Sequence, residues 1–285
     1  MGASQYVVVG AGLAGAATAW SLARQAHEVT VVERAQPAAR DGSSHGSARI
    51  FRYAYSDAFY TRLVVQARKR WDELERVCTK ELITRTGSLD FGPSRDPRKL
   101  ATVLAAEGVE HDLLDREEAR SRWPHIAADT ETLWHPDAGV IDAESAVRAM
   151  VDQATENGAQ LRTDWELRRI TTARNGFRLS AVNGEELDAE KIVVAAGGWL
   201  PHLLGDLELP SDFLAALPPL QVSQEQAYHF PYRDETTRWP TFIHRSPALY
   251  TYSLPGGRDA GFRGQKLAEF RGGPEISSAV TRPAP

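Results

Sequence analysis

The stretch QYVVVGAGLAGAATAW, residues 5–20, decides the fold. Its first five residues predict a short buried strand, because β-branched residues are common in strands. A GxGxxG motif follows at Gly10, Gly12 and Gly15, and residues 14–25 predict a helix of small and apolar residues. Gly10 permits a tight turn, Gly12 lets backbone N–H groups approach a pyrophosphate, and Gly15 lets the helix pack closely on the strand.

A second apolar strand is predicted over residues 28–32 and ends at Glu33. A carboxylate at this point can hydrogen-bond a ribose 2′-hydroxyl. The glycine motif alone also admits a turn that binds nothing. The strand before it, the helix after it and the position of Glu33 favour a dinucleotide site.

The rest of the chain favours FAD over NAD, because the simple alternation of strands and helices stops after Glu33 and a polar glycine-serine loop takes over. The elements predicted later are a helix, three short strands and a buried strand that ends in paired glycines: residues 144–156, 160–167, 177–182, 185–187 and 191–199. A helix, a small β-meander and such a strand are typical of the second half of an FAD-binding fold.

Composition limits the other possibilities. The 285 residues are 42% hydrophobic and 25% charged, with a net charge of −5 and no basic stripe, which argues against nucleic acid as a partner. The single cysteine, Cys78, excludes an intrachain disulfide, and the eight histidines have no metal-site spacing. The first cationic residue is Arg24, so we predict no signal peptide, no membrane span and a cytoplasmic protein.

The loop DGSSHGSARIFRYAY, residues 41–55, resembles the corresponding loop of the monomeric sarcosine oxidase and N-methyltryptophan oxidase branch of the D-amino-acid-oxidase-like (DAO) flavoproteins. Similar segments occur at residues 86–92, 122–124 and 261–267, so the resemblance covers nearly the whole chain. It implies an α/β (α+β) fold, in which a Rossmann-like FAD-binding domain with a β-meander is interleaved with an antiparallel-sheet substrate domain. The predicted domains are residues 1–83 and 145–218 for FAD, 84–144 and 219–274 for substrate, and a tail at 275–285.

The resemblance also implies non-covalent FAD contacts. Ser43 and Ser44 match residues that contact the flavin and its phosphates, and Leu167 matches a backbone contact to the adenine end. The full predicted cofactor-binding set is Gly10, Gly12, Gly15, Glu33, Arg34, Ser43, Ser44, Arg49, Leu167 and Gly197.

Four residues are predicted to act in catalysis. By resemblance, His45 and Arg49 line the face of the flavin ring, Arg52 holds the substrate carboxylate and Lys266 assists oxygen activation. A guanidinium fork suits a carboxylate, and a compact ammonium suits a point of developing negative charge. Plain structural roles stay open: Arg49 and Arg52 as solvated loop arginines, His45 bonded to a nearby carbonyl, and Lys266 as a surface lysine on a strand.

Two helices carry predictions of structure only. Residues 59–78 predict an amphipathic helix whose apolar stripe, from Tyr60 and Leu63 to Cys78, faces the core, with Cys78 as a small core residue. Asp115 is predicted to cap a second helix, with Glu118 as the capping-box acid.

Two features depart from the family pattern. Phe270 stands where sarcosine oxidases carry a substrate-side histidine, which suits a bulkier or more apolar substrate. The C-terminal continuation of the family, with its cysteine for covalent flavin attachment, is expected to be missing, so covalent attachment of that kind is not expected.

The implied function is an FAD-dependent oxidase of secondary or N-methyl amino acids that yields an imine and hydrogen peroxide. Its partners would be a small amino-acid-like substrate and molecular oxygen, and the protein would be a monomer. Two alternatives stay open: a related flavin dehydrogenase of D-amino or imino acids, and an inactive truncated FAD-binding fragment.

Overall fold

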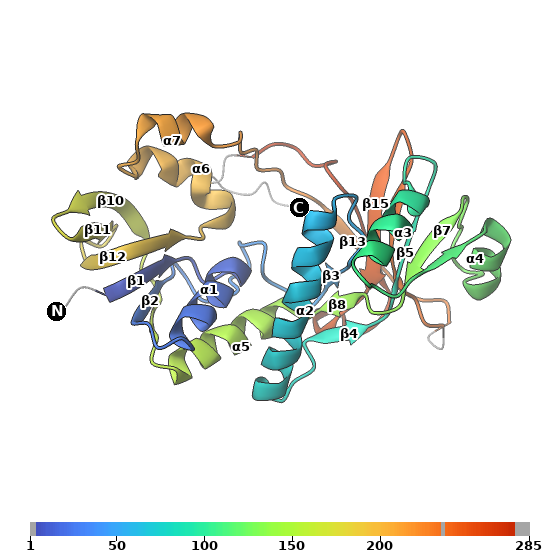
Figure 1. Ribbon diagram of the computed structural model, residues 1–285, viewed down its shortest axis with the longest axis horizontal. Coiled ribbons are helices and arrows are strands. Elements are labelled where there is room, and N and C mark those ends of the chain that lie inside the picture. Colours follow the sequence, from blue (N-terminus) through green and yellow to red (C-terminus); the bar gives the residue numbers. More distant parts are fainter. Residues whose placement is uncertain (1–3, 235–236, 277–285) are drawn as a thin grey trace. The chain divides into compact units, whose positions relative to one another are not determined.

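The computed structural model describes residues 4–234 and 237–276, which form two compact units (Figure 1). Among these residues, the first unit comprises 4–46, 143–224 and 275–276, and the second comprises 47–142 and 225–274. Each unit is interrupted in sequence by the other, as the interleaved domains predict.

The first unit is a six-stranded sheet in the order β10-β11-β12-β1-β2-β9. Four neighbouring strands, from β12 to β9, are parallel, while β10, β11 and β12 form the antiparallel meander. The bounds of its strands are Ser4–Val9 (β1), Val29–Val32 (β2), Gln160–Arg162 (β9), Leu167–Ala173 (β10), Gly176–Ala181 (β11) and Glu186–Val194 (β12). This arrangement confirms the predicted Rossmann-like half with a meander.

Two long helices of the first unit pack against each other. Helix α1 (Leu13–Ala23) packs against α5 (Ala143–Glu156), and both bury several alanines, which let the two helices approach closely. The shorter helical segments are η1 (Gly197–Trp199), α6 (Leu200–Leu203), η2 (Leu204–Asp206) and α7 (Ser211–Ala216). Two of the predicted strands, 185–187 and 191–199, prove to be one strand, β12, which ends at Val194.

The second unit has a seven-stranded sheet in the order β13-β16-β15-β14-β5-β7-β6. Only its pair of β14 with β5 is parallel, so the predicted antiparallel sheet is confirmed with one exception. The bounds of its strands are Ser88–Phe91 (β5), Asp112–Leu114 (β6), Thr132–His135 (β7), Ala227–Phe230 (β13), Thr241–Arg245 (β14), Tyr250–Pro255 (β15) and Gln265–Glu269 (β16).

A small antiparallel sheet, β3-β8-β4, completes the second unit. The remaining bounds of this unit are Arg49–Phe51 (β3), Ala58–Cys78 (α2), Ile83–Arg85 (β4), Pro97–Ala106 (α3), Arg116–Arg122 (α4), Gly139–Ile141 (β8) and Arg258–Ala260 (η3). Asp115 caps α4 by accepting from the Glu118 N–H at 2.8 Å, as predicted.

The compact units differ from the predicted functional domains chiefly at residues 47–83. These residues lie in the second unit because β3 and β4 both pair with β8, whose sequence comes later in the chain. Of the predicted tail, Glu275 bridges to Ser223 and the Ile276 N–H donates to the Val222 carbonyl in the first unit. Residues 277–285 lie outside the described part of the chain.

Helix α2 corrects two predictions about the core. Tyr60 and Leu63 are 53% and 44% exposed, because Thr61 turns inward instead and donates to the Tyr53 carbonyl at 3.0 Å. Cys78 is only partly buried, and its Sγ lies 3.9 Å from two backbone carbonyl oxygens at the end of the helix.

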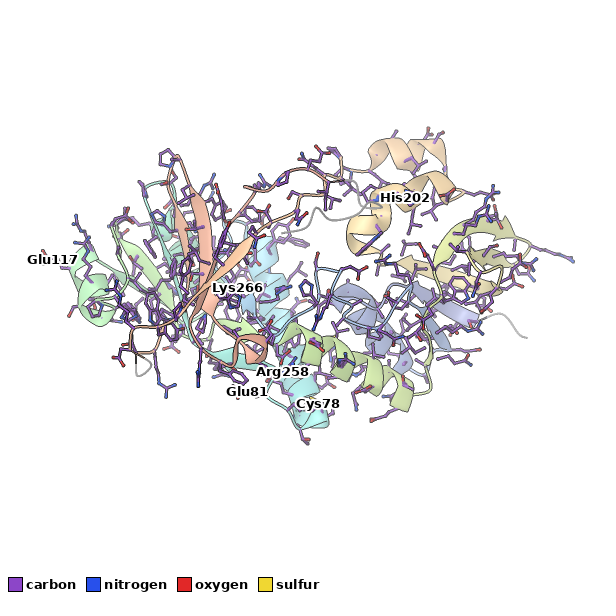
Figure 2. All side chains as sticks on the ribbon, turned by 180° about the vertical axis from the view of Figure 1, so that it is seen from behind. Cys78, Glu81, Glu117, His202, Arg258 and Lys266 are labelled. Carbon is purple, nitrogen blue, oxygen red and sulfur yellow. The ribbon has the colours of Figure 1, made fainter. Side chains whose placement is uncertain are left out.

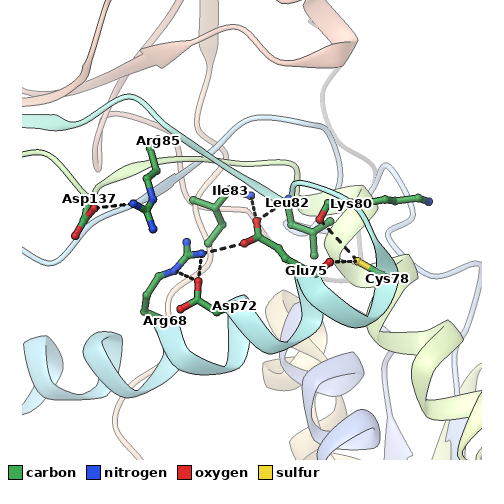
Figure 3. A network of polar contacts seen from close by, with 9 residues as sticks. All are labelled: Arg68, Asp72, Glu75, Cys78, Lys80, Leu82, Ile83, Arg85 and Asp137. Atoms are coloured by element: carbon green, nitrogen blue, oxygen red, sulfur yellow. Dashed lines mark hydrogen bonds and ion pairs between the residues drawn. The ribbon is translucent and has the colours of Figure 1, made fainter.

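A polar network holds the end of α2 (Figure 3). The Glu75 Oε1 accepts from the backbone N–H groups of Leu82 and Ile83, both at 2.8 Å, and its Oε2 accepts from Arg68 at 2.9 Å. One carboxylate therefore joins the helix to the start of β4.

Candidate functional sites

A pocket of about 440 Å³ lies at the carboxyl ends of the parallel strands of the first unit, and we call it the cradle pocket. It is lined by Gly10 and Gly12 of the glycine motif, by most of residues 32–44, by the segment around Trp165 and Leu167, and by the residues that follow β12. Ligands of open α/β sheets bind at this edge, next to the amino end of the first helix.

The glycines of the motif are required by close backbone approaches. Gly10 has φ +98°, and a Cβ there would lie 2.6 Å from the Ala195 carbonyl oxygen. A Cβ at Gly15 would lie 1.8 Å from the Gly10 carbonyl oxygen, so Gly15 permits the packing of helix on strand without lining the pocket. At Gly12, a Cβ would meet the Ser44 Oγ at 3.2 Å, in the space where a phosphate approaches.

Glu33 lines the cradle pocket with both carboxylate oxygens fixed. Its Oε2 accepts from the Ala11 N–H at 2.7 Å, and its Oε1 accepts from the Ala35 N–H at 3.0 Å. A carboxylate has about four lone-pair positions, so it keeps acceptor capacity for ribose hydroxyls. These residues therefore fit the dinucleotide part of FAD.

The other predicted cofactor residues of this unit also line the cradle pocket: Arg34, Ser43, Ser44, Leu167 and Gly197. The Ser44 Oγ accepts from the Leu13 N–H at 3.0 Å, at the start of α1. Arg34 forms an ion pair with Asp41, and its guanidinium carbon lies 4.3 Å from the ring centroid of Trp199. Trp199 and Asp41 were not predicted, because a tryptophan after paired glycines and an acid in a polar loop match no motif.

His45 belongs to the first unit but does not line the cradle pocket. Its Nδ1 contacts the Gly42 carbonyl oxygen, which is the plain structural role that the sequence left open. A role beside the flavin ring stays a prediction for this residue.

The second unit contains a smaller pocket of about 170 Å³, which we call the arginine pocket. Its lining residues are Ile50, Arg52, Ile243, Tyr250, Tyr252 and Phe270. They come from β3 and the residue that follows it, from the residue that follows β16, and from the paired strands β14 and β15, so residues about 200 positions apart meet here. Tyr250 and Phe270 contact each other, with ring centroids 4.9 Å apart.

Arg52 is the charged group of this pocket. Its Nη1 is buried and has no hydrogen-bond partner among the described residues, and its guanidinium carbon lies 4.9 Å from the Tyr55 ring centroid. Burial lowers the pKa of Arg52, but the nearby Asp90, with Tyr55 and Tyr250, outweighs this and raises it. A buried, charged donor without a partner is suited to bind a carboxylate.

A fully buried carboxylate, Asp90, supports this region. Its Oδ1 accepts from Arg95 Nε at 2.9 Å and Nη2 at 2.6 Å, and its Oδ2 lies 3.3 Å from His135 Nε2. Arg95 Nη2 also donates to the Ala54 carbonyl at 3.2 Å. Burial raises the pKa of Asp90, but His135, Arg95 and Arg52 together lower it below the usual value.

Arg49 and Lys266 lie together in the second unit, since both donate to the Ala48 carbonyl oxygen, at 2.9 Å from Nη1 and 3.4 Å from Nζ. Lys266 is half-buried on β16 (Figure 2), which differs from a plain surface lysine. Burial, helped by the nearby Arg49, lowers the pKa of Lys266 to about 8, while Asp259 opposes the shift. Burial also lowers the pKa of Arg49.

No cluster of three or more metal-ligating side chains occurs within residues 4–234 and 237–276. In the same part of the chain, none of the helices combines the length and the hydropathy needed to cross a bilayer.

The fold and the cradle pocket define a flavoprotein-type oxidoreductase. Residues 5–275 match the DAO family, described as FAD dependent oxidoreductase, and the chain belongs to this family. This confirms the resemblance, and FAD is the cofactor of the family.

Relatives agree with this placement. The chain is 32% identical over 210 residues to the monomeric sarcosine oxidase of Bacillus sp. (strain B-0618), which covers 71% of this chain and 53% of that enzyme. It is 28% identical over 284 residues to the N-methyl-L-tryptophan oxidase of Yersinia pestis (strain Pestoides F), covering 97% of this chain and 72% of that enzyme. The chain thus spans about half of the first relative.

Among solved structures, the fold is similar to that of NikD, an unusual amino acid oxidase essential for nikkomycin biosynthesis. The TM-score is 0.80 at 22% sequence identity, and the match covers 99% of this chain and 73% of that chain. At this identity the likeness concerns the fold alone.

Proposed function

We propose that this protein is an FAD-dependent oxidase of secondary or N-methyl amino acids, giving an imine and hydrogen peroxide. The observation that carries the proposal is Arg52, the one charged residue of a pocket otherwise lined by apolar and aromatic side chains, whose buried Nη1 has no hydrogen-bond partner among the described residues. The names of the sequence relatives, sarcosine oxidase and N-methyltryptophan oxidase, agree with this substrate class.

The chain's own residues would bind and orient the substrate. Arg52 would hold the carboxylate by a charge-assisted hydrogen bond, which fixes the orientation of the C–N bond. The wall formed by Tyr250 and Phe270 would accept an apolar or aromatic substrate side chain. We therefore favour N-methyl amino acids with larger side chains over sarcosine.

In the overall reaction, two electrons and two protons leave the substrate amine to give the imine, and molecular oxygen receives them to give hydrogen peroxide. FAD, when bound, supplies the hydride acceptor. Arg49 and Lys266 would provide fixed positive charge where negative charge develops, with Lys266 in its ammonium form acting on oxygen. His45 would help to position the ring.

The remaining proposals concern the setting of the enzyme. We place it in the cytoplasm as a monomer that uses molecular oxygen. The single cysteine agrees with a reducing compartment, and FAD would be held non-covalently.

The test begins with the visible absorption spectrum of the purified chain after addition of FAD and removal of the excess. A retained flavin spectrum is expected, followed by peroxide release with N-methyl-L-tryptophan and N-methyl-L-leucine that exceeds the release with sarcosine. No retained flavin would overturn the proposal and favour a non-catalytic fragment.

A Lys266→Met variant separates oxidase from dehydrogenase. We expect its turnover with oxygen to fall while its turnover with an artificial electron acceptor persists, because only the first reaction uses the ammonium. An unchanged rate with oxygen would contradict the role of Lys266. Wild-type turnover with the acceptor but none with oxygen would favour the dehydrogenase.

A further inference from the structure

Two cations of the second unit share one hydrogen-bond acceptor. Arg49 Nη1 and Lys266 Nζ both donate to the Ala48 carbonyl oxygen, at 2.9 Å and 3.4 Å. Ala48 itself is buried, so this carbonyl lies in an environment where two like charges repel each other strongly. A nearby negative charge would favour the protonated form of Lys266 in this arrangement.

Asp259 is held in position to supply that charge. Its backbone N–H donates to Ser47 Oγ at 2.8 Å, while the Ser47 N–H donates to Asp259 Oδ2 at 3.4 Å and the Ser47 hydroxyl donates to Oδ1. These reciprocal bonds join residues 212 positions apart and tie the turn η3 to the residue before Ala48.

The close approach of the turn to Ser47 depends on a glycine. A Cβ at Gly257 would lie 2.4 Å from the Ser47 carbonyl oxygen, so only glycine lets the turn come this near. Ser47 is 3% exposed, whereas Asp259 lies at the surface. The buried serine therefore fixes the direction in which a surface carboxylate points.

The charged and titratable groups around Lys266 come from four neighbouring elements. Arg49 of β3 lowers the pKa of Lys266, and Asp259 of η3 raises it. His229 stands opposite Lys266 on β13, where it is exposed, and Tyr252 of β15 lies near Arg49. Of these groups, Asp259 is the one whose negative charge favours the ammonium.

We propose that Asp259, held by Ser47, is a positioning residue that keeps Lys266 in its ammonium form beside Arg49. The use of that ammonium in the reaction with oxygen rests on the proposed oxidase function. The arrangement of charges is independent of that function, and the titration of Lys266 can be measured on the chain without FAD. Asp259 thereby sets the pH range over which Lys266 acts.

The primary experiment measures the titration of Lys266 itself. The pH dependence of acetylation by acetic anhydride, followed for each lysine peptide by mass spectrometry, gives the pH at which Lys266 loses its proton. The exposed Lys69 serves as internal reference. The wild type is expected to have its midpoint at about pH 8.

Three variants test the role of the carboxylate at low ionic strength. Asp259→Asn is expected to lower the midpoint by roughly 0.5 unit, since a nearby opposite charge is lost. Ser47→Ala keeps the charge but releases it, and a smaller decrease is expected. Asp259→Glu restores the charge and should restore most of the shift.

The matched control is Asp142→Asn, because Asp142 pairs with Arg258, the neighbour of Asp259, at 3.2 Å and is not among the charges that shift the pKa of Lys266. Its midpoint should equal that of the wild type. The proposal would be overturned if Asp259→Asn had the wild-type midpoint, or if Asp142→Asn lowered the midpoint as much as Asp259→Asn does. If Asp259→Asn fails to fold, an unchanged Lys266 midpoint in Ser47→Ala would overturn the proposal.

A second readout concerns the loaded enzyme. The rate of the oxygen reaction should decline as pH rises through the midpoint of Lys266, and this decline should begin at lower pH in Asp259→Asn with an unchanged KM for substrate. Absence of flavin or of peroxide would contradict the proposed function alone, because the acetylation midpoints would still decide the role of Asp259.

Discussion

The cradle pocket of the first unit and the arginine pocket of the second are built in different ways. The cradle pocket depends on backbone geometry, with glycines at Gly10 and Gly15 whose replacement would bring a Cβ within 2.6 Å and 1.8 Å of carbonyl oxygens. The arginine pocket depends on side chains of distant segments, such as Arg52 and Phe270. A backbone site leaves a local sequence motif, whereas a side-chain site depends on strand order and register.

The largest effect is expected at Arg52. Arg52→Ala should reduce kcat/KM for the N-methyl amino acid by about 10³-fold, since the substrate carboxylate loses its buried charged partner. Arg52→Lys keeps the charge but loses the fork, so a smaller loss is expected. Steady-state peroxide release measures both.

The control for Arg52 is Arg245→Ala, an exposed arginine of β14 that lies 5.4 Å from the Tyr250 ring centroid without lining the pocket. Its kcat/KM should stay near the wild-type value. Equal losses in the two variants would show that the effect comes from general charge and not from carboxylate binding.

Asp90 supports the arginine pocket, and its removal should chiefly affect stability. Asp90→Asn is expected to lower the free energy of unfolding by about 3 kcal/mol, because the buried Arg95 and His135 lose their charged partner. Urea denaturation measures this. Glu131→Gln, which breaks the pair with the exposed Arg98, should cost less than about 1 kcal/mol.

The pH dependence of stability gives a further test of Asp90. Its pKa is lowered in the folded state, so its contribution is complete above the ordinary aspartate pKa of about 3.9 and is lost as pH falls through the folded value. The acid limb of wild-type stability below about pH 4 should therefore be flatter in Asp90→Asn. Parallel acid limbs would contradict this assignment.

Gly15 is the corresponding test for the cradle pocket. Gly15→Ala should lower the free energy of unfolding by roughly 2 kcal/mol and weaken FAD retention, because the new Cβ would displace the Gly10 backbone. Gly205→Ala is the matched control, since a Cβ there meets nothing within 4 Å. Equal losses in both would indicate that helix–strand packing is not the cause.

The smallest effect is expected at Glu33. Glu33→Gln should weaken FAD binding about tenfold. In the wild type each carboxylate oxygen accepts from a backbone N–H, whereas the NH₂ group of a glutamine would face one of these donors and could not accept from it. A fluorescence titration with FAD measures the affinity. Glu28→Gln, at an exposed position just before β2, should bind FAD as the wild type does.

Sequence reasoning succeeded where structure is local. The first strand, the glycine motif and the capped helix at Asp115 follow from short-range patterns, and each is found in the structure. Along α2 it was right for Trp71 and Leu74, which are buried, and wrong for Tyr60 and Cys78, which are not. Periodicity identifies an apolar side of a helix, but only tertiary packing decides which turns of that side are covered.

By itself, the sequence determined the fold class, because a dinucleotide cradle requires glycines at fixed spacing between a strand and a helix. The family and its FAD followed from the resemblance of residues 41–55 and from the elements predicted after Glu33. Only the tertiary structure decided which side chains meet. It brought Phe270 against Tyr250, buried the Arg52 Nη1 where no other described residue pairs with it, and tied Asp259 to Ser47. Such contacts depend on the pairing of strands that are far apart in the chain, and no local pattern of residues encodes that pairing.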